Sequence, residues 1–171
     1  LKVQKMSRGQ EIRTLSYISL VSNVAVSPDG RFIISCGSYD RTIKMWETST
    51  GKEIHTLKGH GSSVKGVAVS PDGHFIVSCG SYDGTIKVWE TVTGQEIRTL
   101  KGYTSSSGVA ISPDGRFIIS GSSDNTVKVW EVSTGKEIRT FESHTSSVNA
   151  VAVSPDGRFI ISSSRDNTVK V

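Results

Sequence analysis

Long apolar runs and helical periodicity are both missing from this chain of 171 residues. No stretch approaches the roughly 20 apolar residues that cross a bilayer, so we expect no membrane span and no membrane partner. Disorder is not expected either, because 35% of the residues are hydrophobic and only 21% are charged. The 17 glycines lie among many serines and threonines between short apolar runs, which is typical of an all-β protein rich in turns.

Motifs for phosphate, metal or glycan attachment are absent as well. The glycines stand at turns and strand starts, and no loop of them could cradle a phosphate group. There is no Asn-x-Ser/Thr acceptor. His55 and His74 stand where equivalent positions of the chain carry arginine, and lone histidines make poor metal sites. We therefore expect no cofactor and no metal.

A basic block of the kind that binds nucleic acid is missing too, although the net charge is +4. The 20 lysines and arginines are interleaved with 16 acidic residues along the whole chain. This arrangement indicates a solvated rim of mixed charge, and we expect no nucleic-acid partner.

What the sequence does contain is a repeat. The string Ser-Pro-Asp-Gly begins at Ser27, Ser70, Ser112 and Ser154, with spacings of 43, 42 and 42 residues. Its proline presets φ at the second turn position, and its glycine accepts the positive φ that closes the turn. The units are so alike that they indicate recent duplication or deliberate design.

Each repeat holds four strand signals in the same order. In the second repeat they are Val64–Val69, Phe75–Ser78, Thr85–Trp89 and Gln95–Leu100. The last of them alternates polar and apolar residues, as a half-exposed outer strand should. Four short antiparallel strands in about 42 residues predict an all-β fold, a β-propeller built of four-stranded antiparallel blades.

The spacing predicts a single propeller domain, or half of one, over residues 1–171. Its expected parts are a leading fourth strand at 1–15, whole blades at 16–57, 58–100 and 101–141, and a last blade lacking its fourth strand at 142–171. Cys36 and Cys79 fall at equivalent points of neighbouring blades, about 10 Å apart if the sheets pack face to face. Because a disulfide needs a shorter separation, we expect free thiols and a cytoplasmic protein.

The Gly59-His60 pair, the turn at 81–84 and the strand that ends in Trp89 resemble the signature of the WD-repeat family. The resemblance covers essentially the whole chain. One departure is shared by three tryptophans, each followed by Glu where the family usually has Asp: Trp46, Trp89 and Trp130. Because Glu keeps the charge, we expect little consequence for the fold.

The family resemblance implies a hydrogen-bonded network inside each blade. It runs from a loop His through a second-strand Ser and a turn Asp to the third-strand Trp, and His60, Ser78, Asp83 and Trp89 match it. A Ser-His-Asp set also suggests a hydrolase, but no signal marks a cleft or an oxyanion hole. We expect a structural network and no enzyme activity, since buried polar groups need such partners. Its other expected members are His144, Ser162, Asp166, Asp40, Trp46, Asp124 and Trp130.

The network is incomplete in two blades, which should therefore be looser. Ser16-Tyr17 and Gly102-Tyr103 stand where Gly-His is expected. The first two blades also carry an extra residue beside the second-strand Ser, and a β-bulge there would absorb it. Two alternatives for the Ser position stay open: Ser35 or Cys36 in blade one, and Ser78 or Cys79 in blade two.

The leading hypothesis is a non-enzymatic protein-interaction scaffold, in one setting a part of a multidomain signalling or sensor protein. The resemblance implies partner binding at the face that carries the second-to-third-strand loops and the starts of the first strands. Positions that vary there stand out against a nearly constant framework, and Tyr and Arg are enriched at binding hot spots. We expect a protein or peptide partner at one face of the disc, at Tyr39, Tyr82, Arg165, Lys65 and Asn149.

Two rival functions stay open. One is an architectural or recently amplified repeat with no specific partner. The other is a small-ligand binder or enzyme that uses the central channel. That rival would need ionisable residues converging on the first strands, which carry mostly Val, Ala, Gly and Ser.

A homodimer is the expected way of closing the ring. Leu1–Gln4 aligns with the end of a third strand and Gln10–Leu15 with a fourth strand. WD-repeat propellers commonly have about seven or eight blades, so four blades make about half a turn. Two copies around a two-fold axis could close an eight-bladed ring, each completing the last blade of the other. The alternatives are an excerpt of a longer array and a four-bladed monomer.

Overall fold

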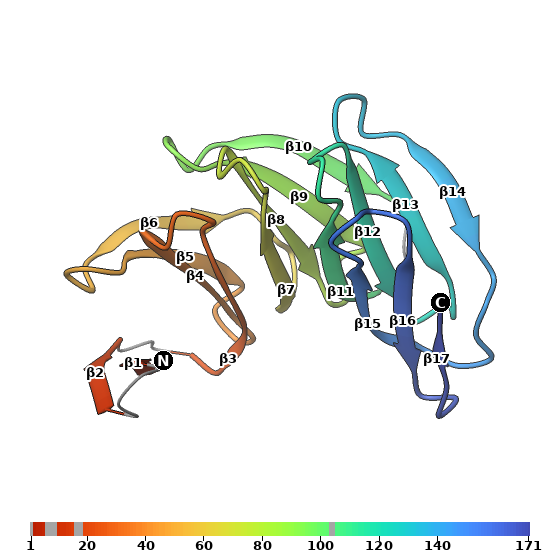
Figure 1. The fold of residues 1–171 in the computed structure, drawn as a ribbon, viewed down its shortest axis with the longest axis horizontal. Coiled ribbons are helices and arrows are strands. Elements are labelled where there is room, and N and C mark those ends of the chain that lie inside the picture. The colour runs from red at the N-terminus through yellow and green to blue at the C-terminus, as the bar shows by residue number, and fades with distance from the viewer. Residues whose placement is uncertain (1, 6–9, 16–18, 103–104) are drawn as a thin grey trace.

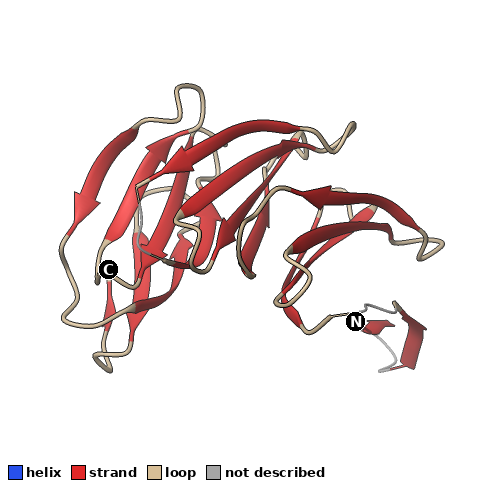
Figure 2. Cartoon of the chain, turned by 180° about the vertical axis from the view of Figure 1, so that it is seen from behind, coloured by secondary structure: helices blue, strands red, loops and turns tan. Residues whose placement is uncertain are grey.

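The computed structural model describes residues 2–5, 10–15, 19–102 and 105–171, and all its regular elements are strands (Figure 2). They form three four-stranded sheets, one three-stranded sheet and one two-stranded sheet, and every pairing is antiparallel. The prediction of an all-β propeller fold with four-stranded antiparallel blades is confirmed.

Within each sheet the strands pair in chain order. The two-stranded sheet is Lys2–Lys5 (β1) and Gln10–Thr14 (β2). Blade one is Val21–Val26 (β3), Phe32–Gly37 (β4), Thr42–Glu47 (β5) and Glu53–Lys58 (β6), and blade two is Val64–Val69 (β7), Phe75–Gly80 (β8), Thr85–Glu90 (β9) and Glu96–Lys101 (β10). Blade three is Ser106–Ile111 (β11), Phe117–Ser122 (β12), Val127–Glu131 (β13) and Glu137–Phe141 (β14), and blade four is Val148–Val153 (β15), Ile160–Ser164 (β16) and Val169–Lys170 (β17). Lys58 and Lys101 close β6 and β10, one residue beyond the expected blade limits.

The sheets lie side by side along an open arc, from β1 and β2 at one end to β15–β17 at the other (Figure 1). The first strands of the blades, β3, β7, β11 and β15, contact one another in turn. Glycines permit this close approach, because a Cβ on Gly66 would lie 3.0 Å from Sγ of Cys79 and 3.3 Å from the backbone nitrogen of Val109. A side chain at Gly66 would therefore push neighbouring blades apart.

In the turn from the first to the second strand, the polar groups are hydrogen-bonded to other residues of the same turn. In blade one the N–H of Gly30 donates to the carbonyl of Ser27 at 2.8 Å, and Gly30 has a φ of 72°. The Ser27 hydroxyl donates to Asp29 at 2.6 Å and accepts the N–H of Phe32 at 2.9 Å. Such a turn forms from local contacts alone, which explains why it marks each blade so clearly in the sequence.

The hydrophobic core lies between neighbouring sheets. Ile34 of blade one packs in one buried cluster with Val64 and Trp89 of blade two. Comparable clusters join the second blade to the third and the third to the fourth. Each blade is therefore stabilised chiefly by its neighbours, as in other repeat proteins. A smaller cluster near β2 consists of Leu15, Ile33 and Trp46.

Candidate functional site

Four side chains form a hydrogen-bonded chain through the second blade. The indole N–H of Trp89 donates to Oγ of Ser78 at 2.8 Å, and Ser78 lies 2.8 Å from Nε2 of His60. Nδ1 of His60 lies 2.8 Å from Oδ2 of Asp83. An indole only donates and a carboxylate only accepts. The Ser78 hydroxyl therefore donates to Nε2, and Nδ1–H donates to Asp83.

The charges of this chain are set by burial and hydrogen bonding. Burial lowers the pKa of His60 below its ordinary value, in spite of the carboxylate beside it. Burial acts to raise the pKa of Asp83, but hydrogen bonds from His60 and Thr85 hold that pKa below its ordinary value. Asp83 also accepts the N–H of Gly61 at 2.9 Å. At neutral pH a neutral imidazole thus donates to a carboxylate that ties the loop before β7 to the turn after β8.

The Ser78 hydroxyl is poorly placed to act as a nucleophile. Ser78 is 0% exposed and Trp89, which covers it, is 1% exposed. Its oxygen already accepts from the indole while its hydrogen is donated to the imidazole. A hydrolase needs a serine that substrate can reach, next to donors for an oxyanion. In this blade the Ser-His-Asp set holds three segments of chain together.

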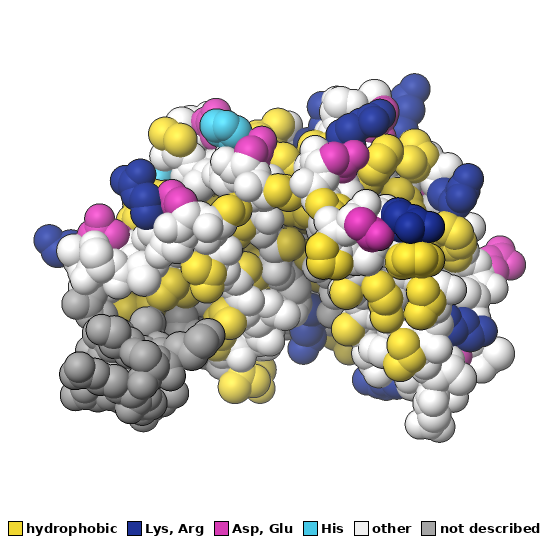
Figure 3. Space-filling model, in the orientation of Figure 1, with side chains coloured by type: hydrophobic (Ala, Val, Ile, Leu, Met, Phe, Trp, Pro, Cys, Tyr) yellow, Lys and Arg dark blue, Asp and Glu magenta, His cyan; other side chains and the backbone are white. Residues whose placement is uncertain are grey.

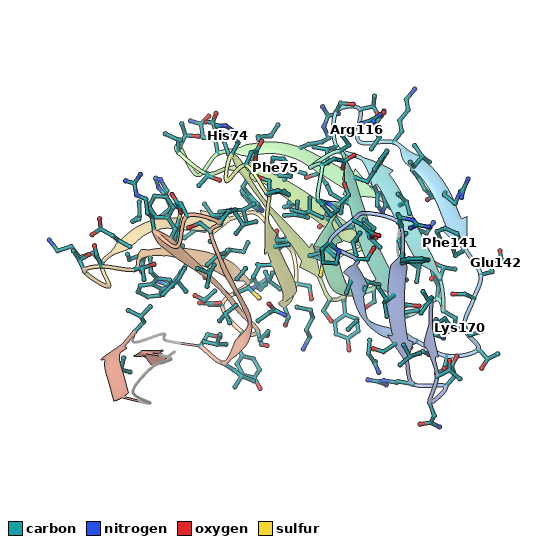
Figure 4. The ribbon with its side chains drawn as sticks, in the orientation of Figure 1. His74, Phe75, Arg116, Phe141, Glu142 and Lys170 are labelled. Atoms are coloured by element: carbon teal, nitrogen blue, oxygen red, sulfur yellow. The ribbon has the colours of Figure 1, made fainter. Side chains whose placement is uncertain are left out.

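The fourth blade repeats the contacts of the histidine. Nδ1 of His144 lies 2.8 Å from Oδ2 of Asp166, and its Nε2 lies 2.8 Å from Oγ of Ser162. Ser162 is 5% exposed and lines a hollow of about 350 Å³. Phe141 and Lys170, which line the same hollow, are labelled in Figure 4. The same residue types at the same spacing therefore give the same geometry in two blades.

Blades one and three keep the tryptophan bond without a histidine. The indole of Trp46 donates to Ser35 at 2.8 Å, and that of Trp130 donates to Ser120 at 3.0 Å. The turn acids accept from the N–H and the hydroxyl of the threonine two residues later: Asp40 from Thr42, and Asp124 from Thr126. Residues of the sequence interpretation that lie outside the described residues are Leu1, Ser16, Tyr17 and Tyr103.

The alternative between serine and cysteine is decided by the indole bonds. Ser35 and Ser78 accept them, whereas Cys36 and Cys79 are buried free thiols. Burial raises the pKa of Cys36 to about 12. Serine is preferred at this position because its oxygen accepts a hydrogen bond far better than a thiol does.

The extra residue of the first two blades lies in a turn. Cys36 pairs with Ile43, and in blade three Gly121 pairs with Val127, with no register shift in either ladder. The connection between the paired residues is one residue longer in blade one, and Arg41 occupies its left-handed position with a φ of 58°. The expectation of a β-bulge beside the serine was therefore wrong, because a longer turn leaves the ladder intact.

Bulges occur instead at the second residue of every first strand. In β7 the register shifts on either side of Lys65, and in β15 it shifts on either side of Asn149. Both side chains are exposed, whereas the preceding Val64 and Val148 are 0% exposed. A bulge re-aims the side chain of the extra residue. Here the bulge directs to the surface the side chain at a position that varies between repeats, away from the packed interior.

A hollow of about 370 Å³ brings four of the five expected partner residues together. Lys65 and Asn149 reach it from the starts of β7 and β15, Tyr82 from the turn after β8, and Arg165 from the turn after β16. Antiparallel pairing places the start of a first strand beside the end of the second, so these positions share one end of the blades. We call the lining the basic hollow; its other members are Ser81, Ser105, Ser123 and Ser147.

Tyr39, the fifth expected residue, is not part of the basic hollow. It holds in the turn after β4 the place that Tyr82 holds after β8, and the two are 79% and 80% exposed. The N–H of Tyr39 donates to Oγ of Ser19 at 3.0 Å. Tyr39 therefore lies at the same end of its blade, one blade farther along the arc.

Sequence reasoning missed the third-strand lysines, which it assigned to a solvated rim. Lys87 is only 8% exposed, and its ammonium donates to Glu96 and to Thr99, each at 2.7 Å. The ammonium also lies 5.9 Å from the ring centre of Trp89. The missed signal is the recurrence of Lys two residues before each Trp and of Glu nine residues after that Lys. The same pairing joins Lys44 to Glu53 and Lys128 to Glu137.

Groups of three or more His, Cys, Asp or Glu side chains suited to a metal ion do not occur in the described ranges. No helix with the length and apolar character needed to cross a membrane is found in that part of the chain.

Comparison with known proteins identifies several relatives. "Dynein assembly factor with WD repeat domains 1" of Mus musculus is 47% identical over 49 residues, which cover 29% of this chain and 12% of that protein. An uncharacterized WD repeat-containing protein of Synechocystis sp. is 43% identical over 56 residues, 32% of this chain and 16% of the relative. "Ribosome assembly protein 4" of Saccharomyces cerevisiae is 47% identical over 45 residues, 26% of this chain and 8% of the relative. The matches thus span only a small part of these relatives.

The family described as "WD domain, G-beta repeat" matches the chain at residues 9–47, 51–90, 94–131 and 135–171. The four matches overlap the four blades, and each contains one Ser-Pro-Asp-Gly turn and the strand that follows it. With its sequence matched over most of its length and its strands folded as propeller blades, this chain belongs to the WD-repeat family.

Proposed function

We propose that this chain is a non-enzymatic protein-interaction scaffold that binds a peptide or a protein domain at the basic hollow. The observation that carries the proposal is the convergence of four variable residues at one place: Lys65, Tyr82, Asn149 and Arg165. They come from blades two and four, on either side of blade three. Variation gathered at one end of a constant framework supports the proposal, because binding residues commonly lie on loops that a rigid scaffold positions.

We propose that the chain is not an enzyme because the Ser-His-Asp set of blade two is buried, with Ser78 0% exposed. WD-repeat domains are generally non-catalytic scaffolds. The names of two relatives, a dynein assembly factor and a ribosome assembly protein, describe assembly roles for those proteins. They support a role in bringing proteins together.

Selection from a random peptide display library tests the proposal. The purified chain is compared with Tyr82→Ser and Asn149→Ser, which introduce residues that blade three already carries at the equivalent places, Ser123 and Ser107. Selected peptides should lose at least about tenfold in affinity with these variants, because Tyr anchors dominate small interfaces. Arg116→His is the matched control, since His74 stands at the equivalent turn of blade two. Peptides that ignore Tyr82 and Asn149 but depend on Arg116 would contradict the proposal.

Two rivals give different outcomes in the same experiment. An amplified repeat without a partner selects no peptide. A binder in the central channel selects ligands whose affinity depends on the first strands and not on Tyr82.

A homodimer that closes an eight-bladed ring stays a proposal of its own. It needs β2 to pair with the last blade of a second copy, but the structure pairs β2 with β1, so β1 would have to move. Sedimentation giving twice 18.4 kDa supports it, and a stable monomer at 18.4 kDa contradicts it.

A cytoplasmic location is likewise proposed, and the free thiols of Cys36 and Cys79 support it.

A further inference from the structure

We infer that the basic hollow recognises a phosphorylated side chain of an extended peptide. The inference rests on the proposed function and names the chemistry of its ligand. Three observations support it. Two cations line the hollow, hydroxyl groups line it with them, and the carboxylates nearest in sequence are hydrogen-bonded to other groups.

The first observation is the pair of cations. Lys65 and Arg165 both line the hollow, one from a strand bulge of blade two and one from a turn of blade four. Among the described residues, neither forms an ion pair with a carboxylate. The third-strand Lys87, by contrast, is already bound to Glu96. Two uncompensated cations beside one cavity attract an anion.

The second observation is the set of polar groups that line the hollow together with the cations. The serines at the rim come from blades two, three and four, and the Asn149 amide stands with them. The hydroxyls of Ser81 and Ser105 have no hydrogen-bond partner in the described part of the chain, whereas that of Ser147 donates to the carbonyl of Ser123 at 3.4 Å. Free hydroxyls and an amide supply donors for the several oxygens of one anionic group.

The third observation concerns the acids nearest in sequence. Among the described residues that line the hollow there is no carboxylate. Asp83 follows Tyr82 and Asp166 follows Arg165, but their oxygens accept from the histidines and from backbone N–H groups. The two carboxylates are thus engaged by the histidines and backbone N–H groups, and neither lines the hollow or pairs with Lys65 or Arg165.

A phosphate monoester fits this set better than a carboxylate does. It carries a charge of about −1.5 to −2 and three acceptor oxygens, which match two cations and several donors. Arg also binds phosphate through two parallel hydrogen bonds. About 370 Å³ holds the phosphate and the residue that bears it.

A peptide is favoured over a nucleic acid by the distribution of charge on the molecule. A nucleic-acid backbone needs a continuous basic track. On the face shown in Figure 3 basic and acidic side chains alternate, and no basic band crosses it. The positive charge is local, as a single phosphate requires.

Fluorescence polarisation with defined peptide libraries tests the inference. Three libraries of randomised peptides are centred on phosphoserine, phosphothreonine or phosphotyrosine, and each has an unphosphorylated counterpart. At physiological salt at least one phosphorylated library should bind at least about tenfold more tightly than its counterpart, as expected for charge-assisted hydrogen bonds. Equal binding of phosphorylated and unphosphorylated libraries, or no binding of either, overturns the inference.

The site is tested with substitutions that the chain itself uses. Arg165→Ser copies Ser123, and Lys65→Ser copies Ser22 and Ser107 at equivalent positions. Each should weaken phosphopeptide binding about fivefold or more, and together they should abolish the preference for phosphate. Arg116→His removes a charge at the opposite end of a blade and should leave binding within about twofold. Phosphopeptide binding that survives both serine substitutions overturns the assignment to the hollow.

Single-stranded DNA of matched charge separates a phosphate site from general attraction to polyanions. Binding of DNA as tight as that of the phosphopeptides overturns the inference. If displayed peptides bind through Tyr82 and Asn149 without any preference for phosphate, the inference fails while the proposed function stands. If no binding depends on any of these residues, both fail.

Discussion

The Nδ1 atom of His60 lies 2.8 Å from Oδ2 of Asp83, a hydrogen bond between residues 23 positions apart in the chain. It joins the loop that enters blade two to the turn between β8 and β9. Blade three builds the same turn around Asp124 without a described histidine partner. Comparing blade two with blade three therefore measures how much this hydrogen bond contributes to the free energy of unfolding.

Asp83→Ala should lower the free energy of unfolding by about 1–3 kcal/mol, because it removes the carboxylate that accepts from the His60 imidazole and from the N–H of Gly61. Only the Thr85 hydroxyl, 3.2 Å from Nδ1, remains near the imidazole N–H. Asp124→Ala is the matched control and should cost clearly less, since among the described residues the Asp124 carboxylate bonds only within its own turn. Denaturant unfolding followed by tryptophan fluorescence measures both. Equal costs would mean that the histidine bond contributes nothing beyond the turn.

Stability should fall as the pH drops below about 6.5. The folded-state pKa of His60 is lowered, so the unfolded chain binds a proton first and stability declines by at most about 1.4 kcal/mol per pH unit. The lowered pKa of Asp83 adds a loss only below its ordinary value of 3.8, as the pH falls through the folded pKa. Denaturant unfolding between pH 7.5 and about 4.5 measures the slope. In His60→Tyr, which copies Tyr17, the slope between pH 6.5 and about 5 should shrink; an unchanged slope would assign it to other groups.

Gly66→Ala should destabilise the protein by about 1–3 kcal/mol, because the new methyl group meets Sγ of Cys79 and the backbone of blade three. Gly61→Ala is the control, since its methyl group would meet only Cβ of Asp83 at an ordinary 3.5 Å. Thermal unfolding of the two variants measures the difference. Comparable losses would show that the inner strands have room to separate.

Arg41→Gly should stabilise the protein by about 0.5–1 kcal/mol. A left-handed residue with a side chain costs about 1–2 kcal/mol, and the greater freedom of glycine in the unfolded chain offsets part of the gain. Blade two already uses Gly84 at this turn position, with a φ of 65°. The Arg41 guanidinium donates to the carbonyl of Gly61 at 3.2 Å, and both Arg41→Gly and Arg41→Ala remove this hydrogen bond. Because alanine keeps Cβ, Arg41→Ala should not increase stability. A similar gain in both variants would trace the effect to the arginine side chain.

How much the sequence predicts depends on how local the contacts are. The Ser27–Gly30 turn closes with bonds among neighbours, and the strands that flank it follow an apolar pattern that needs no partner to be read. The hydrogen bond from Lys87 to Glu96 depends on the pairing of β9 with β10. Composition alone does not show that pairing, so Lys87 was predicted to lie on a solvated rim.

The sequence by itself determined the repeat, the strand order and the turns, because each depends on residues within a few positions of one another. Only the tertiary structure decided that Ser35 accepts the Trp46 indole while Cys36 lies beside it, since that choice depends on ladder register. It also decided that Lys65 and Arg165 line one hollow, although they are 100 positions apart in the chain. The physical reason is the packing of successive first strands, which brings the ends of three blades close enough for their side chains to share one cavity.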